Sequence, residues 1–285
     1  MKPAAFHYHA PKTVEEAVAL LAELAPQDGR ILAGGQSLVP TMAFRLARPA
    51  HLVDINGVAG LDTLRVEGGA LRIGACVRHA AFHRPVCDGP LGRLLSAVVR
   101  HIAHYPIRMR GTFCGSVAHA DPASEWSLVA AALDATMVAQ STRGERLIRA
   151  AEFFEGVMTT ALAEDELLRE VRLPILPDDT RFGFQEFSRR AGDFGIAMAL
   201  ATYRVESGAI ADPRIGIGGA EDRPRRIAEA EGALAGKEPG DAAFRAAAAA
   251  AADAVDPMED FSTSAQYRRD LVATLTRRAL EQASA

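Results

Sequence analysis

Two short glycine-rich stretches, residues 33–37 (AGGQS) and 111–116 (GTFCGS), are the part of the sequence best suited to binding chemistry. Glycine lets successive backbone N–H groups point in the same direction, and its missing side chain lets a ligand come close. A concave row of N–H groups binds anions such as phosphate. One such turn alone is often structural, but two of them, each ending in serine, fit a ligand with two linked phosphates. The sequence therefore predicts a diphosphate ligand held between the two stretches.

Neither stretch matches the better-known phosphate-binding motifs. A Walker loop places a lysine after its last glycine, whereas Gln36 follows Gly35 here. A dinucleotide fingerprint has the spacing G-x-G-x-x-G, with an acidic residue about 20 positions later, and residues 33–36 lack that spacing. The sequence thus disfavours a GTPase, a kinase and an ordinary Rossmann dehydrogenase.

Polar residues beside the second stretch admit more than one role. Arg108 and Arg110 would either neutralise bound phosphates or lie on a solvated face. The histidines nearby are not accompanied by a cluster of cysteines or acids that would complete a metal site, so no metal is expected. His119 and Asp121 have no nucleophile placed beside them, which disfavours a hydrolase. We expect the second stretch to form a loop, and we interpret His119 as a residue that hydrogen-bonds this loop.

The composition is that of a globular protein with room for a core and two domains. The 285 residues are 49% hydrophobic with a formal net charge of −4, so no nucleic-acid partner is expected. No run approaches the roughly 18 consecutive apolar residues of a membrane span, so no membrane-spanning segment is expected. Cys76, Cys87 and Cys114 form no C-x-x-C pair, which argues against a disulfide framework, a structural zinc site and a protein-held iron–sulfur cluster. These features indicate the reducing cytoplasm.

Predicted helices and strands place the first stretch directly after a buried strand. Thr13 and Glu16 form a capping box that predicts a helix over residues 13–25. Hydrophobic periodicity predicts the other elements of this half. They are strands at 31–33, 52–55, 61–66, 70–75, 136–139, 147–148 and 168–173, helices at 91–104 and 122–133, and a turn or short helix at 38–46.

Two prolines and two acids in residues 174–179 mark the best domain boundary. Beyond it the pattern predicts strands at 182–188, 197–206 and 214–218 and helices at 225–234, 241–255 and 264–283. The alanine-rich run 246–252 within them suggests a surface helix. We therefore predict domains at 1–176, with units of about 1–57 and 58–176, and at 177–285. The second domain is predicted to be α+β, with helices on one face of an antiparallel sheet.

Several segments together carry a family resemblance. They are residues 33–40, 108–116 and 119–123, Gly192-Asp193-Phe194 and residues 264–269. With them the chain resembles the FAD-binding medium subunit of molybdenum hydroxylases, the family of the carbon monoxide dehydrogenase medium subunit and the xanthine dehydrogenase flavin domain. The resemblance covers nearly the whole chain. The two glycine-rich motifs at this separation are far more specific together than either is alone.

The resemblance implies an α+β, two-subdomain FAD-binding fold of the vanillyl-alcohol-oxidase (PCMH) type, followed by a C-terminal domain of the carbon monoxide dehydrogenase flavoprotein type. It also implies which residues bind the cofactor. The backbone of two groups would hold the pyrophosphate: Ala33, Gly34, Gly35, Gln36 and Ser37, and Thr112, Phe113, Cys114, Gly115 and Ser116. Glu125 stands where the family has an acid near the ribose or adenine of FAD. Phe194 stands where the family often has an aromatic residue against the isoalloxazine. Leu168 and Glu186 match positions that line the flavin.

The sequence departs from the family pattern at two positions. Cys114 replaces the first glycine of the usual T-x-G-G, so the backbone there cannot use angles open only to glycine. Met109 stands where asparagine is common. Two interpretations of Phe194 remain open, a ring facing the flavin or an ordinary core residue. Two interpretations of Cys114 also remain open, a reactive thiol or a small residue that fills a packed turn.

The implied function is electron transfer within a larger enzyme. FAD would take electrons from a small iron–sulfur subunit and pass them to a soluble acceptor, while a large molybdenum-cofactor subunit oxidises the substrate. The absence of a triad or metal site is consistent with this role, because the flavin itself does the redox chemistry. The alternatives are a non-catalytic nucleotide-binding module and a stand-alone flavin oxidase.

Overall fold

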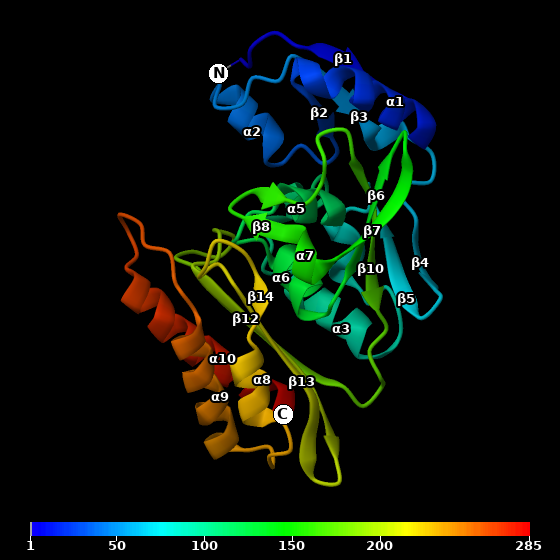
Figure 1. Cartoon of the computed structure of the whole chain (residues 1–285). Helices are drawn as coiled ribbons and strands as arrows, with labels where there is room; N and C mark the ends of the chain where they lie inside the picture. The colour runs from blue at the N-terminus through cyan, green and yellow to red at the C-terminus, as the bar shows by residue number, and fades with distance from the viewer. Residues whose placement is uncertain (1) are drawn as a thin grey trace.

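The computed structural model describes residues 2–285, in which three main sheets follow one another along the chain (Figure 1). The first sheet is parallel, with strand order β1-β3-β2. Its elements are β1 (His7–His9), α1 (Val14–Leu24), η1 (Ala25–Gln27), β2 (Gly29–Leu32), α2 (Leu38–Ala43), β3 (His51–Asp54) and η2 (Ile55–Gly57). The capping box is confirmed, since Thr13 Oγ1 accepts from the Glu16 N–H at 3.1 Å and the Glu16 carboxylate accepts from the Thr13 N–H at 3.3 Å.

The second sheet is antiparallel, with strand order β4-β5-β10-β6-β7. Its strands are β4 (Leu64–Glu67), β5 (Ala70–Gly74), β6 (Thr136–Ser141), β7 (Gly144–Arg149) and β10 (Leu167–Pro174). The helices and small strands around it are η3 (His79–His83), α3 (Gly89–Val98), α4 (Tyr105–Arg108), α5 (Phe113–His119), α6 (Glu125–Ala132), α7 (Ala150–Phe153), β8 (Phe154–Gly156) and β9 (Thr159–Thr160).

Two predictions for this region were wrong in detail. The helix predicted over 91–104 ends at Val98, and a separate short helix begins at Tyr105. Ala103 has a φ of +41° and His104 is extended, so a continuous helix cannot run through this point. The second glycine-rich stretch is not a loop but the first turn of α5, with Thr112 as its N-cap.

The third sheet is antiparallel, with strand order β11-β12-β13-β14, and carries the C-terminal helices (Figure 1). Its elements are β11 (Arg181–Phe187), β12 (Ala197–Glu206), β13 (Ala209–Gly218), β14 (Arg225–Arg226), α8 (Ala228–Leu234), α9 (Asp241–Ala254) and α10 (Ala265–Ser284). The alanine-rich run is a helix at the surface, as predicted, and Ala246 and Ala249 are exposed. Ala247 and Ala251 are fully buried in one core with residues of α8 and α10, because the small side chains allow close packing between helices.

The central strands of the third sheet are buried on both faces. On β13, Ile215 and Ile217 belong to the core beneath the C-terminal helices. A Cβ on Gly216 would lie 2.6 Å from the Ala132 side chain of α6, so this opposite face meets α6. Since side chains alternate along a strand, the sheet packs between its own helices and α6. This packing joins α6 and the second sheet to the C-terminal sheet.

Within residues 2–285, no helix is both long enough and apolar enough to cross a membrane.

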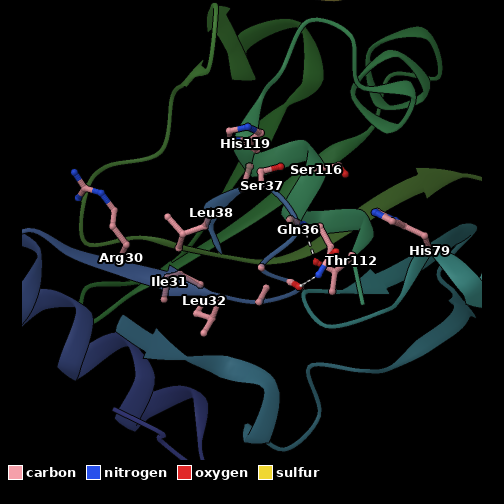
Figure 2. Close-up of a pocket in the computed structure, with 16 residues that line it drawn as sticks. Arg30, Ile31, Leu32, Gln36, Ser37, Leu38, His79, Thr112, Ser116 and His119 are labelled. Carbon is pink, nitrogen blue, oxygen red and sulfur yellow. Dashed lines mark hydrogen bonds between the residues drawn. The ribbon is translucent and has the colours of Figure 1, made fainter. Parts of the chain in front are cut away.

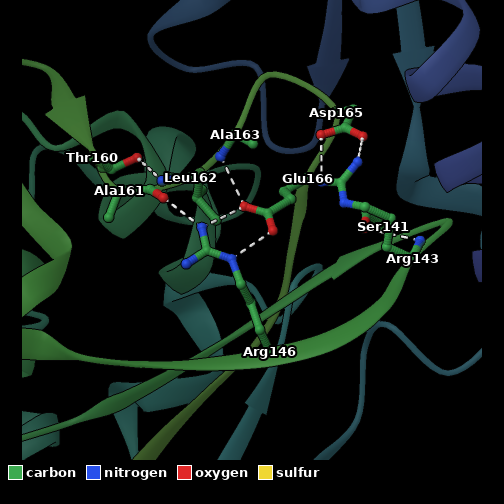
Figure 3. Close-up of polar contacts among 9 residues, drawn as sticks. All are labelled: Ser141, Arg143, Arg146, Thr160, Ala161, Leu162, Ala163, Asp165 and Glu166. Atoms are coloured by element: carbon green, nitrogen blue, oxygen red, sulfur yellow. Dashed lines mark hydrogen bonds and ion pairs between the residues drawn. The ribbon is translucent and has the colours of Figure 1, made fainter.

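A buried carboxylate fixes the loop before β10 (Figure 3). The Glu166 side chain is only 4% exposed and accepts hydrogen bonds from Arg146 Nε at 2.6 Å and from the Ala163 N–H at 2.8 Å. The Arg146 guanidinium holds the pKa of Glu166 below its ordinary value, mainly through this hydrogen bond. Nearby, Arg143 Nη2 donates to Asp165 Oδ1 at 2.9 Å, but that arginine is largely exposed.

Replacing Arg146 with methionine is expected to lower the free energy of unfolding by about 2 kcal/mol, because it leaves a buried carboxylate without its main partner. Arg143→Met is the matched control and should cost less than about 1 kcal/mol, as an exposed ion pair does. Urea unfolding of both variants measures the difference. Equal losses would contradict the structural role given to Glu166.

Candidate functional site

A cavity of about 320 Å³ lies between the end of β2 and the start of α5 (Figure 2). Both glycine-rich stretches contribute to its walls, as the sequence predicted. The lining residues are Arg30, Ile31, Leu32, Ala33, Gly34, Gly35, Gln36, Ser37, Leu38, His79, Gly111, Thr112, Gly115, Ser116, Ala118 and His119. We call it the first cavity. Two stretches far apart in sequence, one from the first sheet and one from the second, therefore form a single site.

The two stretches touch at Gly34. A Cβ built on Gly34 would lie 2.5 Å from the Arg110 carbonyl oxygen and 2.6 Å from the Gly111 Cα. These are backbone atoms and cannot turn aside as a flexible side chain could. Gly35 has a different role. Its φ is +69°, an angle that favours glycine, and a Cβ there would meet the Val39 and Leu32 side chains at 3.1 and 3.2 Å.

A small polar network ties the two stretches together. Asn56 Nδ2 donates to the Ala33 carbonyl at 2.8 Å, and Arg78 Nη2 donates to Asn56 Oδ1 at 2.6 Å. Arg78 Nη1 also donates to the carbonyl of Arg110. One guanidinium thus links both walls of the first cavity. Asn56 and Arg78 could not be recognised from the sequence, because their partners lie far away along the chain.

The first cavity is built to receive an anion. None of its lining residues is an aspartate or glutamate. Within residues 2–285, the N–H groups of residues 34–37 donate to no protein acceptor. The Gln36 side chain donates a hydrogen bond to the Gly34 carbonyl oxygen at 3.0 Å, so this acceptor is already paired within the loop. Free backbone donors without competing carboxylates suit phosphate oxygens.

The second wall is the start of α5. Thr112 Oγ1 accepts from the Gly115 N–H at 3.0 Å, and a Cβ on Gly115 would come 2.6 Å from that oxygen, so the cap requires glycine. Cys114 points away from the cavity into the core, where its Sγ donates to the Ile73 carbonyl. Burial raises the pKa of the Cys114 thiol, which does not suit a reactive thiolate. The helical backbone at Cys114 needs no glycine-only angle.

A second cavity is lined by residues that follow the first cavity closely in sequence. Asp121 lines it, two residues after His119 of the first cavity. It includes Gly192, Asp193 and Phe194 from the loop between β11 and β12 and Arg268 from α10. Phe194 is 72% exposed, so it is not a core residue. The structure therefore rules out one of the two interpretations left open by the sequence, that Phe194 is an ordinary core residue. A large exposed aromatic at a cavity is available to a ligand.

The other proposed site residues, Glu125, Leu168 and Glu186, are buried and line neither cavity. Leu168 belongs to the main core. Glu125 and Glu186 are neighbours, and burial raises the pKa of both carboxyl groups, with their mutual repulsion raising that of Glu186 further. His101 Nδ1 lies 3.8 Å from Glu186 Oε2, and burial lowers the pKa of this histidine, so it does not supply a compensating charge.

The buried pair predicts that stability decreases as pH rises. A carboxyl group whose pKa is raised by folding stabilises the fold below its unfolded pKa, and this contribution is lost as pH rises through the folded value. For Glu186 the loss begins near pH 4.5, its ordinary pKa. Glu186→Gln keeps a neutral side chain of the same shape, so its melting temperature should fall less than the wild type's as pH rises. The exposed Glu23→Gln is the control, and identical pH profiles for all three proteins would contradict the buried pair.

Other residues near the site have structural roles. Arg108 donates to the Ile102 and Ala103 carbonyls at 2.7 and 2.9 Å, so its guanidinium holds the turn after α3 and is not free for phosphate. His119 lines the first cavity, but no hydrogen bond from its ring to the loop is present in the part of the chain that the structure describes. Among residues 2–285, no three or more His, Cys, Asp or Glu side chains are grouped to hold a metal ion.

The parallel sheet, the antiparallel sheet and the first cavity between them fit a protein that binds a phosphate-containing ligand. Comparison with known protein families identifies the ligand class and the family. Residues 4–176 match the FAD binding domain in molybdopterin dehydrogenase, and residues 182–283 match the CO dehydrogenase flavoprotein C-terminal domain. The chain therefore belongs to the FAD-binding subunits of molybdopterin dehydrogenases. It is an oxidoreductase subunit whose cofactor is FAD, and both the predicted fold class and the resemblance are confirmed.

Individual proteins agree with this assignment over the full length. The nicotine 6-hydroxylase medium subunit of Paenarthrobacter nicotinovorans is 40% identical over 100% of this chain and 99% of its own. The carbon monoxide dehydrogenase medium chain of Hydrogenophaga pseudoflava is 35% identical over 99% of this chain and 98% of its own. A chain of the solved carbon monoxide dehydrogenase from that organism superposes with a TM-score of 0.95 at 36% identity, covering 100% of this chain and 99% of its own. A chain of quinoline 2-oxidoreductase from Pseudomonas putida 86 gives 0.92 at 35%, covering 100% and 98%.

Proposed function

We propose that the chain transfers electrons within a heteromeric molybdenum hydroxylase, from a partner iron–sulfur subunit through FAD to a soluble acceptor. The observation that carries the proposal is the first cavity. The loop after β2 presents the unpartnered N–H groups of residues 34–37, and the first turn of α5 forms the facing wall of a space whose lining contains no carboxylate. That arrangement suits a pyrophosphate, which is the part of FAD that a protein can hold through its backbone alone.

In this proposal the backbone of residues 33–37 and 112–116 holds the pyrophosphate. The short segment 119–121, which runs from the first cavity to the second, would carry the cofactor toward Phe194. Bound FAD supplies the redox chemistry, and the protein fixes its position and tunes its potential. Phe194 would cover one face of the isoalloxazine and exclude water from it.

The buried residues would act on the cofactor from behind the cavity walls. Glu125 and Glu186 are neutral when protonated, so they would add no negative charge to the surroundings of the flavin. Leu168 would keep that side apolar. We also propose the domain division at residues 176/177, which agrees with the change from the second sheet to the third sheet.

The partners follow from the names of the relatives. Several are medium subunits or medium chains, a term that implies a smaller and a larger chain in the same complex. We propose a small iron–sulfur subunit and a large molybdenum-cofactor subunit as partners of this chain, working in the cytoplasm. The substrates named for the relatives differ, from nicotine to carbon monoxide, so the substrate would be set by the large subunit and not by this chain.

Purification of the native protein with its bound partners tests this proposal. The expected result is two further chains with the lengths of a small and a large subunit, together with molybdenum and iron in elemental analysis. A chain that purifies alone, contains flavin and oxidises an organic substrate would be a stand-alone flavin oxidase. A chain that purifies alone without flavin would be a non-catalytic nucleotide-binding module.

A further inference from the structure

The first cavity contains one side chain that the N–H donors of the two stretches do not explain. His79, the first residue of η3, is only 4% exposed, yet its ring forms part of the cavity wall. Figure 2 shows the ring edge directed toward Thr112 and Gln36, at the place where the two glycine-rich stretches meet. A buried polar ring in an anion site needs a specific reason, because an unsatisfied nitrogen there costs free energy.

The ring is fixed by a hydrogen bond from behind. Trp126 Nε1 donates to His79 Nδ1 at 2.9 Å, and an indole N–H is a donor only. A neutral imidazole that accepts at one nitrogen carries its proton on the other. The tryptophan therefore places the proton of His79 on Nε2.

The surroundings keep the ring neutral. Burial is the main cause that lowers the pKa of His79, and the nearby Arg108 and Arg78 guanidinium groups lower it further. The ring is thus a donor at Nε2 and an acceptor at Nδ1 across the physiological range. Trp126 is itself fully buried and packs against Phe82 and Phe113, so the donor behind the ring is rigidly held.

The donor faces the cavity without a protein partner. Among residues 2–285, no protein acceptor takes a hydrogen bond from His79 Nε2. The nitrogen lies against Gly111, where a Cβ would come 2.5 Å from it, so any side chain at position 111 would displace the ring. The His79 N–H also donates to the Gly111 carbonyl at 2.9 Å, which fixes the backbone of the two residues together.

We propose that His79 is a cofactor-binding residue whose Nε2–H donates to a phosphate oxygen of FAD, and that Trp126 is the positioning residue that sets its tautomer. This inference rests on the proposed pyrophosphate site and adds a side-chain donor to a site otherwise made of backbone. A neutral donor suits this position, because it binds the phosphate without a charge that would titrate.

Binding of three probes to the apo protein tests the proposal. FAD and ADP both contain the pyrophosphate, whereas riboflavin lacks it. His79→Phe keeps an aromatic ring but removes the donor, so FAD and ADP should bind about tenfold to hundredfold more weakly, the effect of losing one hydrogen bond to a charged group. Riboflavin affinity should not change. His79→Gln can still offer an N–H and should recover part of the loss, and the exposed His7→Phe is the control.

Nitrogen NMR of the wild-type protein provides a readout that does not depend on any variant folding. Histidine-labelled protein should show the His79 proton on Nε2, and addition of ADP should shift the Nε2 signal. Trp126→Phe should shift the Nδ1 signal, because that nitrogen loses its donor. A proton on Nδ1, or an Nε2 signal unaffected by ADP in a protein that binds it, would overturn the proposal.

The two levels of inference fail in different ways. If the wild-type protein binds neither FAD nor ADP, the proposed cofactor site itself is wrong. If the wild type binds both, and folded His79→Phe binds them equally well, only the role of His79 is wrong.

Discussion

Gly34→Ala is expected to remove FAD binding from a chain that still folds. The added methyl group would lie 2.5 Å from the Arg110 carbonyl oxygen, so the two walls of the first cavity must move apart. A pyrophosphate held between the two walls could then contact only one of them. Loss of two such hydrogen bonds weakens binding by about 100-fold or more. Equilibrium titration of the apo protein with FAD measures the change.

A matched control separates this effect from the general cost of replacing a glycine. Gly232 lies in α8, where a Cβ would meet no atom within 4 Å. Gly232→Ala should therefore bind FAD as the wild type does and melt at the same temperature or slightly higher. If Gly34→Ala retains full flavin affinity and an unchanged melting temperature, the two walls do not jointly hold the cofactor.

Phe194→Ala should change the flavin more than it changes the protein. Because Phe194 is 72% exposed, its removal leaves no core cavity and should not lower the melting temperature of the apo protein. If the ring stacks on the isoalloxazine, its loss should increase flavin emission and shift the midpoint potential, since water then reaches the flavin. FAD affinity should fall by about 1–3 kcal/mol, as for base–aromatic stacking elsewhere.

Phe44→Ala is the control for this change. Phe44 is a similarly exposed ring at the end of α2 and lines neither cavity. Its removal should leave emission and potential unchanged. Identical emission and potential in the wild type and Phe194→Ala would show that the aromatic does not face the flavin.

The sequence was informative where local chemistry determines structure. The positive φ of Gly35 and the capping box at Thr13 involve only neighbouring residues, so their roles are visible in the sequence. The second stretch was misread as a loop because its helix signal is weak. Thr112 caps the helix, but the third helical position is Gly115 and not the glutamate of a capping box. The alanine-rich helix was predicted, but its buried face was not, because alanine gives no periodic pattern that distinguishes a buried face from an exposed one.

The residues that complete the site could not be found in this way. Asn56, Arg78 and His79 act on partners that are near only in the folded chain, such as Ala33, Arg110 and Trp126. The proximity of Glu125 to Glu186 has the same origin, since α6 contacts the third sheet only in the folded chain. Sequence spacing carries no record of such contacts.

The most direct test of the central claim is the stoichiometry and release of cofactor from the purified full-length chain. The account predicts one FAD per chain, with visible absorbance of an oxidised flavin that is bleached by a reductant. Excess ADP should displace that FAD, because both contain the pyrophosphate held in the first cavity. A folded chain that contains no flavin and takes up none when FAD is added would contradict the account.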